Sequence, residues 1–271
     1  MSRAEEREPA AKRVGACLDR AMGRPTTLSL DQFRPEDLGG LGSVLHSESN
    51  GMAKQEVSTR NGARCMGGGY PFRTLPDHLR PGLDLVFVGI NPGLYSVQRG
   101  HYFARSTSRF WPAFSTSKLS ERVRRALGTT TLRAEHDAEL PCFGIGLTDV
   151  VKRPSANAAD LNASDFEKWV PHLLDKLQRY QPLVACFHGL TAYRPFVKFA
   201  LKSADPVPML GRQQEAIGAT RLYVVPNPSP ANAHFTLADQ TLWYDRLADF
   251  LAAVRPAPVL EPVPLGLGGD K

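Results

Sequence analysis

The stretch that decides the fold runs from Leu83 to Gly93 and reads LDLVFVGINPG. Its first six residues are apolar, β-branched or aromatic with one aspartate, and the run stops at Gly89, which is typical of a buried strand that ends in a tight turn. In an open α/β sheet, ligands bind in the crevice outside the carboxyl ends of the strands. Asn91 therefore lies where such a fold would place a functional side chain.

The chain on both sides of this stretch alternates between strand and helix patterns. Thr107 or Ser108 can cap a helix that begins at Arg109, and Ser164 with Glu167 forms a capping box for an amphipathic helix that we expect to kink at Pro171. The alternation predicts a single α/β domain from about residue 75 to 254, with three α/β/α layers and a mainly parallel central sheet. The other expected strands cover residues 143–151, 183–187 and 221–225, and the other expected helices cover residues 118–127, 191–201 and 237–254.

Both ends of the chain lack this pattern. Residues 1–74 show no sustained period, so we expect a mostly disordered extension with at best a short helix at residues 14–22, and Met52 is a candidate for the true start. Residues 255–271 contain four prolines and three glycines and are expected to be a disordered tail.

Composition narrows the class of protein. No apolar run approaches the length of a membrane span and the N-terminus has no signal-peptide pattern, so we expect a cytoplasmic, nucleoid-associated protein, or a nuclear one in a eukaryote. The formal charge of +6 would suit a polyanionic partner. The four cysteines form no CxxC pair, which argues against a metal site or a disulfide framework, and we expect neither metal nor cofactor.

Two loops at strand ends favour one composite site. Asn91-Pro92-Gly93 is first of all a turn, because proline fixes φ at the second position and glycine supplies a positive φ at the third. The stretch from Pro226 to Ser229 is likewise made of ordinary loop residues. Because both loops follow the carboxyl ends of expected parallel strands, together they predict a ligand site.

From Leu83 to about Leu251 the chain resembles the mismatch-specific uracil/thymine-DNA glycosylases of the uracil-DNA glycosylase superfamily. The matching pieces keep their order along the chain: GINPG at 89–93, Phe103 and RFW at 109–111, GIGLTD at 144–149 with KRP at 152–154, and NPSP at 227–230.

The resemblance implies a monofunctional DNA glycosylase of base excision repair. Such an enzyme flips uracil, thymine or another damaged base out of mismatched double-stranded DNA and hydrolyses its N-glycosidic bond; we expect it to act as a monomer. Asn91 matches the residue that holds the attacking water. Gly89, Ile90 and Phe103 match the substrate-binding residues: the ring of Phe103 would stack on the base, and N–H groups near Ile90 and Phe103 would stabilise its leaving anion.

The loop after the last strand matches the element that enters the duplex, and two positions depart from the family pattern. Ala231 stands where relatives place a large wedge residue, and Asp149 stands where relatives have asparagine or lysine. Asp149 is a strand-end cap of backbone N–H groups or a catalytic carboxylate that takes a proton from the water. The expected DNA contacts are Asn227, Pro228, Ser229, Ala231, Asn232 and His234.

Two other functions fit the same residues. A hydrolase of free nucleosides would need neither a wedge loop nor a basic face. A non-catalytic protein that binds damaged or mismatched DNA would tolerate Ala231, whereas an intact Asn91 favours an enzyme.

Overall fold

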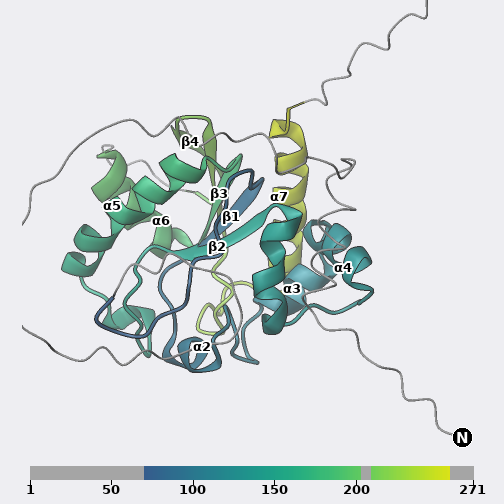
Figure 1. Ribbon diagram of the computed structural model, residues 1–271, viewed down its shortest axis with the longest axis horizontal. Coiled ribbons are helices and arrows are strands. Elements are labelled where there is room, and N and C mark those ends of the chain that lie inside the picture. Colours follow the sequence, from purple (N-terminus) through teal and green to yellow (C-terminus); the bar gives the residue numbers. More distant parts are fainter. Residues whose placement is uncertain (1–69, 203–208, 257–271) are drawn as a thin grey trace, which may run out of the picture.

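The computed structural model describes residues 70–202 and 209–256 (Figure 1). The expected N-terminal helix at residues 14–22, Met52 and most of the expected tail lie outside the described residues.

The fold is built on one five-stranded sheet with the strand order β2-β1-β3-β5-β4. Four strands are parallel and only β4 runs antiparallel to its neighbour β5, which confirms the predicted α/β class with a mainly parallel sheet. The strands are β1 (Leu85–Gly89), β2 (Ile145–Asp149), β3 (Val184–His188), β4 (Gly211–Ile217) and β5 (Thr220–Val225). The sequence pattern missed β4 because this edge strand, GRQQEAI, is largely polar.

Helices cover both faces of the sheet (Figure 1). One face packs against α5 (Ala163–Tyr180) and α6 (Leu190–Phe196), and the other against α3 (Phe110–Thr116) and α7 (Leu237–Val254). Both faces of β1 are therefore buried, which explains its unbroken apolar sequence. Shorter helical pieces complete the described chain: α2 (Leu94–Arg99), η1 (Lys118–Ser120), α4 (Glu121–Leu127), η2 (Ala134–Phe143), η3 (Ala158–Asp160) and η4 (Val197–Leu201).

Alternate residues of each strand divide the core in two. Leu85 and Phe87 of β1 belong to the cluster that includes α3 and α7, whereas Val86 and Val88 belong to the cluster that includes α5 and α6. All four side chains are fully buried. Since side chains alternate along a strand, the next residue on the α3 and α7 side of β1 is Gly89.

Two helix starts differ from the prediction. Helix α5 begins at Ala163, because Asn162 accepts a hydrogen bond from the N–H of Asp165 and thus caps the helix ahead of the expected box at Ser164. The N-cap of α3 is Arg109, while the hydroxyl of Ser108 accepts from the N–H of Phe110 at 3.3 Å.

The packed chain starts ahead of the expected boundary at residue 75. The ring of Tyr70 contacts that of Trp169 edge-on at a centroid distance of 5.1 Å, and the hydroxyl of Thr74 donates to the carbonyl oxygen of Lys152 at 2.7 Å. At the other end, Arg255 pairs with Asp84 at 2.6 Å. Among the described helices, none combines the length and the apolar character that crossing a membrane requires.

Candidate active site

Three parallel strands bring Gly89, Asp149 and His188 side by side at their carboxyl ends. Gly89 of β1 is in register with Asp149 of β2, and both continue the face that packs against α3 and α7. A Cβ atom at position 89 would lie 2.5 Å from Oδ1 of Asp149. Only glycine therefore leaves room for this carboxyl group, which leans over the end of β1.

Asn91 is held through its amide nitrogen. Its Nδ2 donates to the carbonyl oxygen of Arg153 at 3.0 Å and to the hydroxyl of Ser155 at 2.8 Å. Further hydrogen bonds tie the same two loops together: the N–H of Ser155 donates to Pro92, and the N–H of Leu94 donates to Ser155. Within residues 70–202 and 209–256, Oδ1 of Asn91 accepts no hydrogen bond, so this oxygen can accept one from a water molecule.

Asp149 is not a backbone cap. Its side chain is 4% exposed, and neither carboxylate oxygen accepts a hydrogen bond from a described backbone N–H. The nearest cation is Lys152, whose Nζ lies 3.6 Å from Oδ2 of Asp149. Burial, reinforced by the charge of Asp77, raises the pKa of Asp149 from 3.8 to about 6, although Lys152 and the hydroxyl of Tyr102 act in the opposite direction. The carboxyl group can therefore exchange a proton near neutral pH.

Two charged residues that the sequence did not predict as site residues, Lys152 and Asp77, lie beside Asp149. Lys152 is 1% exposed, and its ammonium donates to Oδ1 of Asp77 at 2.9 Å and to the hydroxyl of Tyr102 at 3.2 Å. Lysine is rarely buried and Asp77 lies in a segment with no periodic pattern, so neither gave a signal. The KRP match drew attention to Lys152 only as part of a motif.

Phe103 packs against core side chains and remains partly exposed. Its ring stacks on the buried ring of Phe110, with centroids 4.1 Å apart and planes at 15°, and meets His188 edge-on at 5.2 Å. The side chain is half-buried, so the core supports the ring and part of it remains accessible. The backbone of Phe103 has a φ of 54°, a left-handed conformation that a non-glycine residue rarely adopts.

We expect Phe103→Ala to slow base release about 10-fold, because stacking of a base on an aromatic ring contributes roughly 1–3 kcal/mol. Single-turnover rates with a uracil:guanine duplex, together with thermal melting, provide the measurement. A large loss of melting temperature with an unchanged rate per folded molecule would show that the ring serves the core alone.

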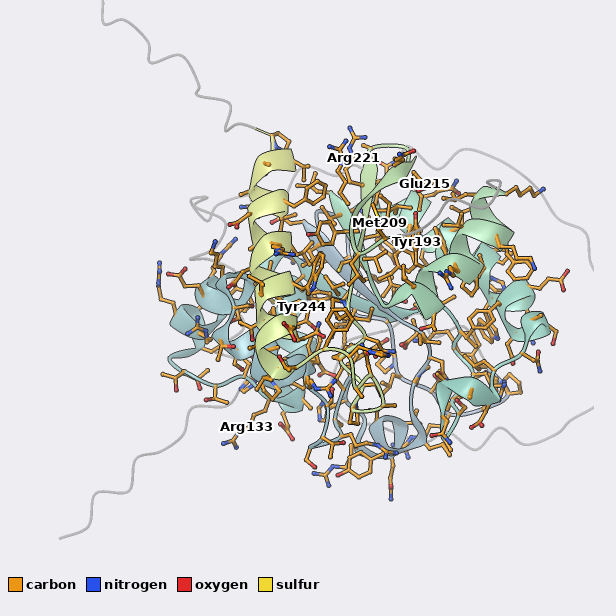
Figure 2. All side chains as sticks on the ribbon, turned by 180° about the vertical axis from the view of Figure 1, so that it is seen from behind. Arg133, Tyr193, Met209, Glu215, Arg221 and Tyr244 are labelled. Atoms are coloured by element: carbon orange, nitrogen blue, oxygen red, sulfur yellow. The ribbon has the colours of Figure 1, made fainter. Side chains whose placement is uncertain are left out.

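The imidazole of His188, which contacts the ring of Phe103, is neutral. Burial lowers the pKa of His188 to about 3, so the imidazole carries no charge in the physiological range. Its Nε2 lies 2.9 Å from the hydroxyl of Tyr244, a residue of α7 (Figure 2), and its ring stacks on Phe87. Nδ1 is buried without a hydrogen-bond partner in the described part of the chain.

The loop after β5 is braced by its own asparagines. Oδ1 of Asn227 accepts from the N–H of Ser229 at 3.0 Å, and Nδ2 of Asn232 donates to the carbonyl oxygen of Asn227 at 3.1 Å. Pro228 is buried, Ser229 is half-buried, and Ala231 and His234 are exposed. Of the expected DNA contacts, the asparagines thus shape the loop, while Ala231 and His234 face outward.

Arg109 connects this loop to α3. Its guanidinium donates to the carbonyl oxygens of Ser229 at 2.9 Å and Asn232 at 3.1 Å, and its N–H donates to Pro228 at 2.9 Å. Its neighbours Phe110 and Trp111 are buried in the core.

We expect Arg109→Met to weaken binding to an abasic duplex about 10-fold at fixed salt, because the loop loosens when it loses two hydrogen bonds from a charged donor. Arg105→Met is the matched control, since Arg105 is exposed and makes no hydrogen bond to this loop. Equal affinities for the two variants would show that Arg109 contributes only charge.

Among the described residues, no group of three or more histidine, cysteine, aspartate or glutamate side chains is placed to hold a metal ion.

The family model described as the uracil DNA glycosylase superfamily matches residues 76–251. The solution NMR structure of a candidate uracil DNA glycosylase from Methanosarcina acetivorans is similar at 19% sequence identity and a TM-score of 0.42, over 66% of this chain and 98% of that one, a likeness too weak to add to the family match. The match over most of the chain shows that this protein belongs to the uracil DNA glycosylase superfamily.

Proposed function

We propose that this DNA glycosylase removes uracil from mismatched duplex DNA as a monofunctional enzyme, with thymine and other damaged bases as further candidate substrates. The observation that carries the proposal is the anchoring of Asn91. Its Nδ2 is fixed by Arg153 and Ser155, which leaves Oδ1 to accept a hydrogen bond and aim a water molecule at the sugar.

The proposed reaction is a hydrolysis. Water oxygen forms a bond to C1′ of the flipped nucleotide while the bond from C1′ to N1 of the base breaks, and the base leaves as an anion. N–H groups near Ile90 and Phe103 stabilise the charge on its oxygens, as in an oxyanion hole. The water's proton passes to Asp149 and then to the departing base or to solvent, because an amide such as Asn91 cannot accept it at neutral pH.

Asp149 suits this role through position and charge. Strand register pairs Asp149 with Gly89, and Gly89 lies two residues before Asn91 in the chain. A carboxylate there stabilises the positive charge that builds up on the sugar as the base departs. Above pH 6 the ionised form predominates, so the rate should fall as the solution becomes more acidic.

The outward side of the β5 loop is proposed to meet the DNA. Ala231 and His234 are exposed, while the hydrogen bonds from Arg109 and Asn232 hold the loop in shape. N–H groups and the hydroxyl of Ser229 would contact phosphates, which position a duplex without reading its sequence.

A gel assay tests the proposed function. A labelled uracil:guanine duplex is incubated with the protein in EDTA, and half of each sample is then heated with alkali, which cuts abasic strands. We expect strand scission only after alkali, with weaker activity on uracil:adenine. Scission without alkali, loss of activity in EDTA, or retention of the base would contradict the proposal; release of uracil from free deoxyuridine alone would identify a nucleoside hydrolase.

A further inference from the structure

Lys152 occupies the centre of a buried polar cluster next to the proposed active site. Its ammonium lies 2.9 Å from Oδ1 of Asp77, 3.2 Å from the hydroxyl of Tyr102 and 3.6 Å from Oδ2 of Asp149. The side chain is 2% exposed, so water contributes little to the solvation of its charge. Burial of an ammonium is costly unless partners of opposite charge surround it, and here two carboxylates do.

The two carboxylates are not equivalent. Asp77 accepts a hydrogen bond from Thr148 at 2.7 Å and pairs with Lys176 of α5 at 2.7 Å, in addition to its bond with Lys152. Although burial opposes ionisation, Lys152 and Lys176 hold the pKa of Asp77 below its ordinary value. Asp149 has no comparable support, because its Oδ2 is buried without a hydrogen-bond partner among the described residues.

Among the described residues, three side chains act on the charge of Asp149. Lys152 approaches from the loop after β2, Asp77 from the segment before β1, and Tyr102 from the loop after α2. Burial raises the pKa of Tyr102 well above its ordinary value, so its hydroxyl stays neutral. A second group, consisting of Asp137 with His78 and His101, lies behind Tyr102, whose N–H donates to Asp137.

We infer that Lys152 is a positioning residue that keeps Asp149 ionised for the reaction, and that Asp77 holds the Lys152 ammonium in place and limits its effect. The inference rests on the proposed function, since it concerns the carboxylate that takes the proton from water. It assigns to the first residue of the KRP match a role in catalysis that does not require contact with the DNA.

Lys152 lowers the pKa of Asp149 and Asp77 raises it, so replacing each residue should shift this pKa in opposite directions. Lys152→Met removes the opposite charge, so the pKa of Asp149 should rise and the acidic limb of the rate should move to higher pH. Asp77→Asn removes a like charge and releases the ammonium toward Asp149, so the limb should move to lower pH. General damage to the fold would not move the limb in opposite directions.

The experiment measures single-turnover release of uracil from a uracil:guanine duplex between pH 5 and 9, with thermal melting of each variant. An opposite charge within about 4–6 Å lowers the pKa of a carboxyl group by about 1–3 units, so we expect the midpoint of the limb to rise by at least about one unit in Lys152→Met and to fall measurably in Asp77→Asn. Lys176→Met is the matched control, because Lys176 pairs with Asp77 but not with Asp149; its midpoint should move less than that of Lys152→Met.

Asp149→Asn separates this inference from the proposed function. If that variant keeps the acidic limb of the wild type, the proton acceptor has been misassigned. If it loses the limb while Lys152→Met and Asp77→Asn both keep the wild-type midpoint, Asp149 is the acceptor and the inference about Lys152 is overturned. If Lys152→Met does not fold, Asp77→Asn provides the test: a shift of the acidic limb to lower pH supports the inference, and an unchanged midpoint or a shift to higher pH overturns it.

Discussion

Replacing Asn91 with alanine should slow uracil release about 10²- to 10³-fold, because the water would lose the group that aligns it with C1′. The fold should persist, since Asn91 is only half-buried and its neighbours Ile90 and Pro92 keep their backbone contacts. Single-turnover rates, normalised to protein that binds DNA, measure the effect.

Ser155→Ala provides the graded control for Asn91. It removes one of the two strong anchors of Nδ2, at 2.8 Å, and leaves the bond to Arg153 at 3.0 Å. We expect a loss of about 10-fold, because a neutral hydrogen bond contributes about 0.5–1.5 kcal/mol. An Asn91→Ala rate within a few-fold of the wild type would show that the amide does not hold the nucleophile.

Asp149→Asn should lower the rate of uracil release and raise the stability of the fold. The variant should release uracil at least about 10²-fold more slowly at pH 8, because a general base contributes about 10²- to 10⁴-fold, and its rate should no longer follow the acidic limb. At the same pH it should gain stability. The folded state carries an Asp149 pKa of about 6, above the ordinary value of 3.8, so this group favours folding below pH 3.8 and that contribution is lost as the pH rises through 6.

The gain should reach up to about 3 kcal/mol at pH 8 relative to pH 4, since each unit of pKa difference corresponds to about 1.36 kcal/mol. Urea unfolding of wild type and variant at both pH values measures it, and taking the difference between them removes any constant effect of the lost contact with Lys152. Identical stability differences at the two pH values would mean that Asp149 does not titrate near neutrality. An unaltered rate of Asp149→Asn across pH 5 to 9 would mean that Asp149 does not act as the base.

The parts of the fold that sequence predicted are those specified locally. The run LVFVG of β1 is apolar at every position because helices cover both faces of the sheet, and that alone identifies a parallel strand. Asn91 could be recognised for the same reason, since a turn directly after such a strand lies at the ligand-binding edge of the sheet.

The residues that sequence missed are defined by contacts between distant segments. Lys152 meets Asp77 across 75 residues, and Arg109 meets the carbonyl oxygen of Ser229 across 120 residues. No local period or cap marks such residues. In the sequence, the buried Lys152 cannot be told from a solvent-exposed lysine, and Arg109 is predicted only as the start of a helix. Strand β4 was missed because its exposure at the edge permits a polar sequence without the apolar run of an interior strand.

The most direct test of the mechanism is a double-mutant cycle between Asn91 and Asp149. Single-turnover uracil release is measured at pH 8 for the wild type, Asn91→Ala, Asp149→Asn and the combined variant. If both residues act on one water molecule, the combined variant should be little slower than the slower single variant, because groups that work as a unit are not additive. Losses that multiply in the combined variant would contradict a shared water and assign the two side chains to separate steps.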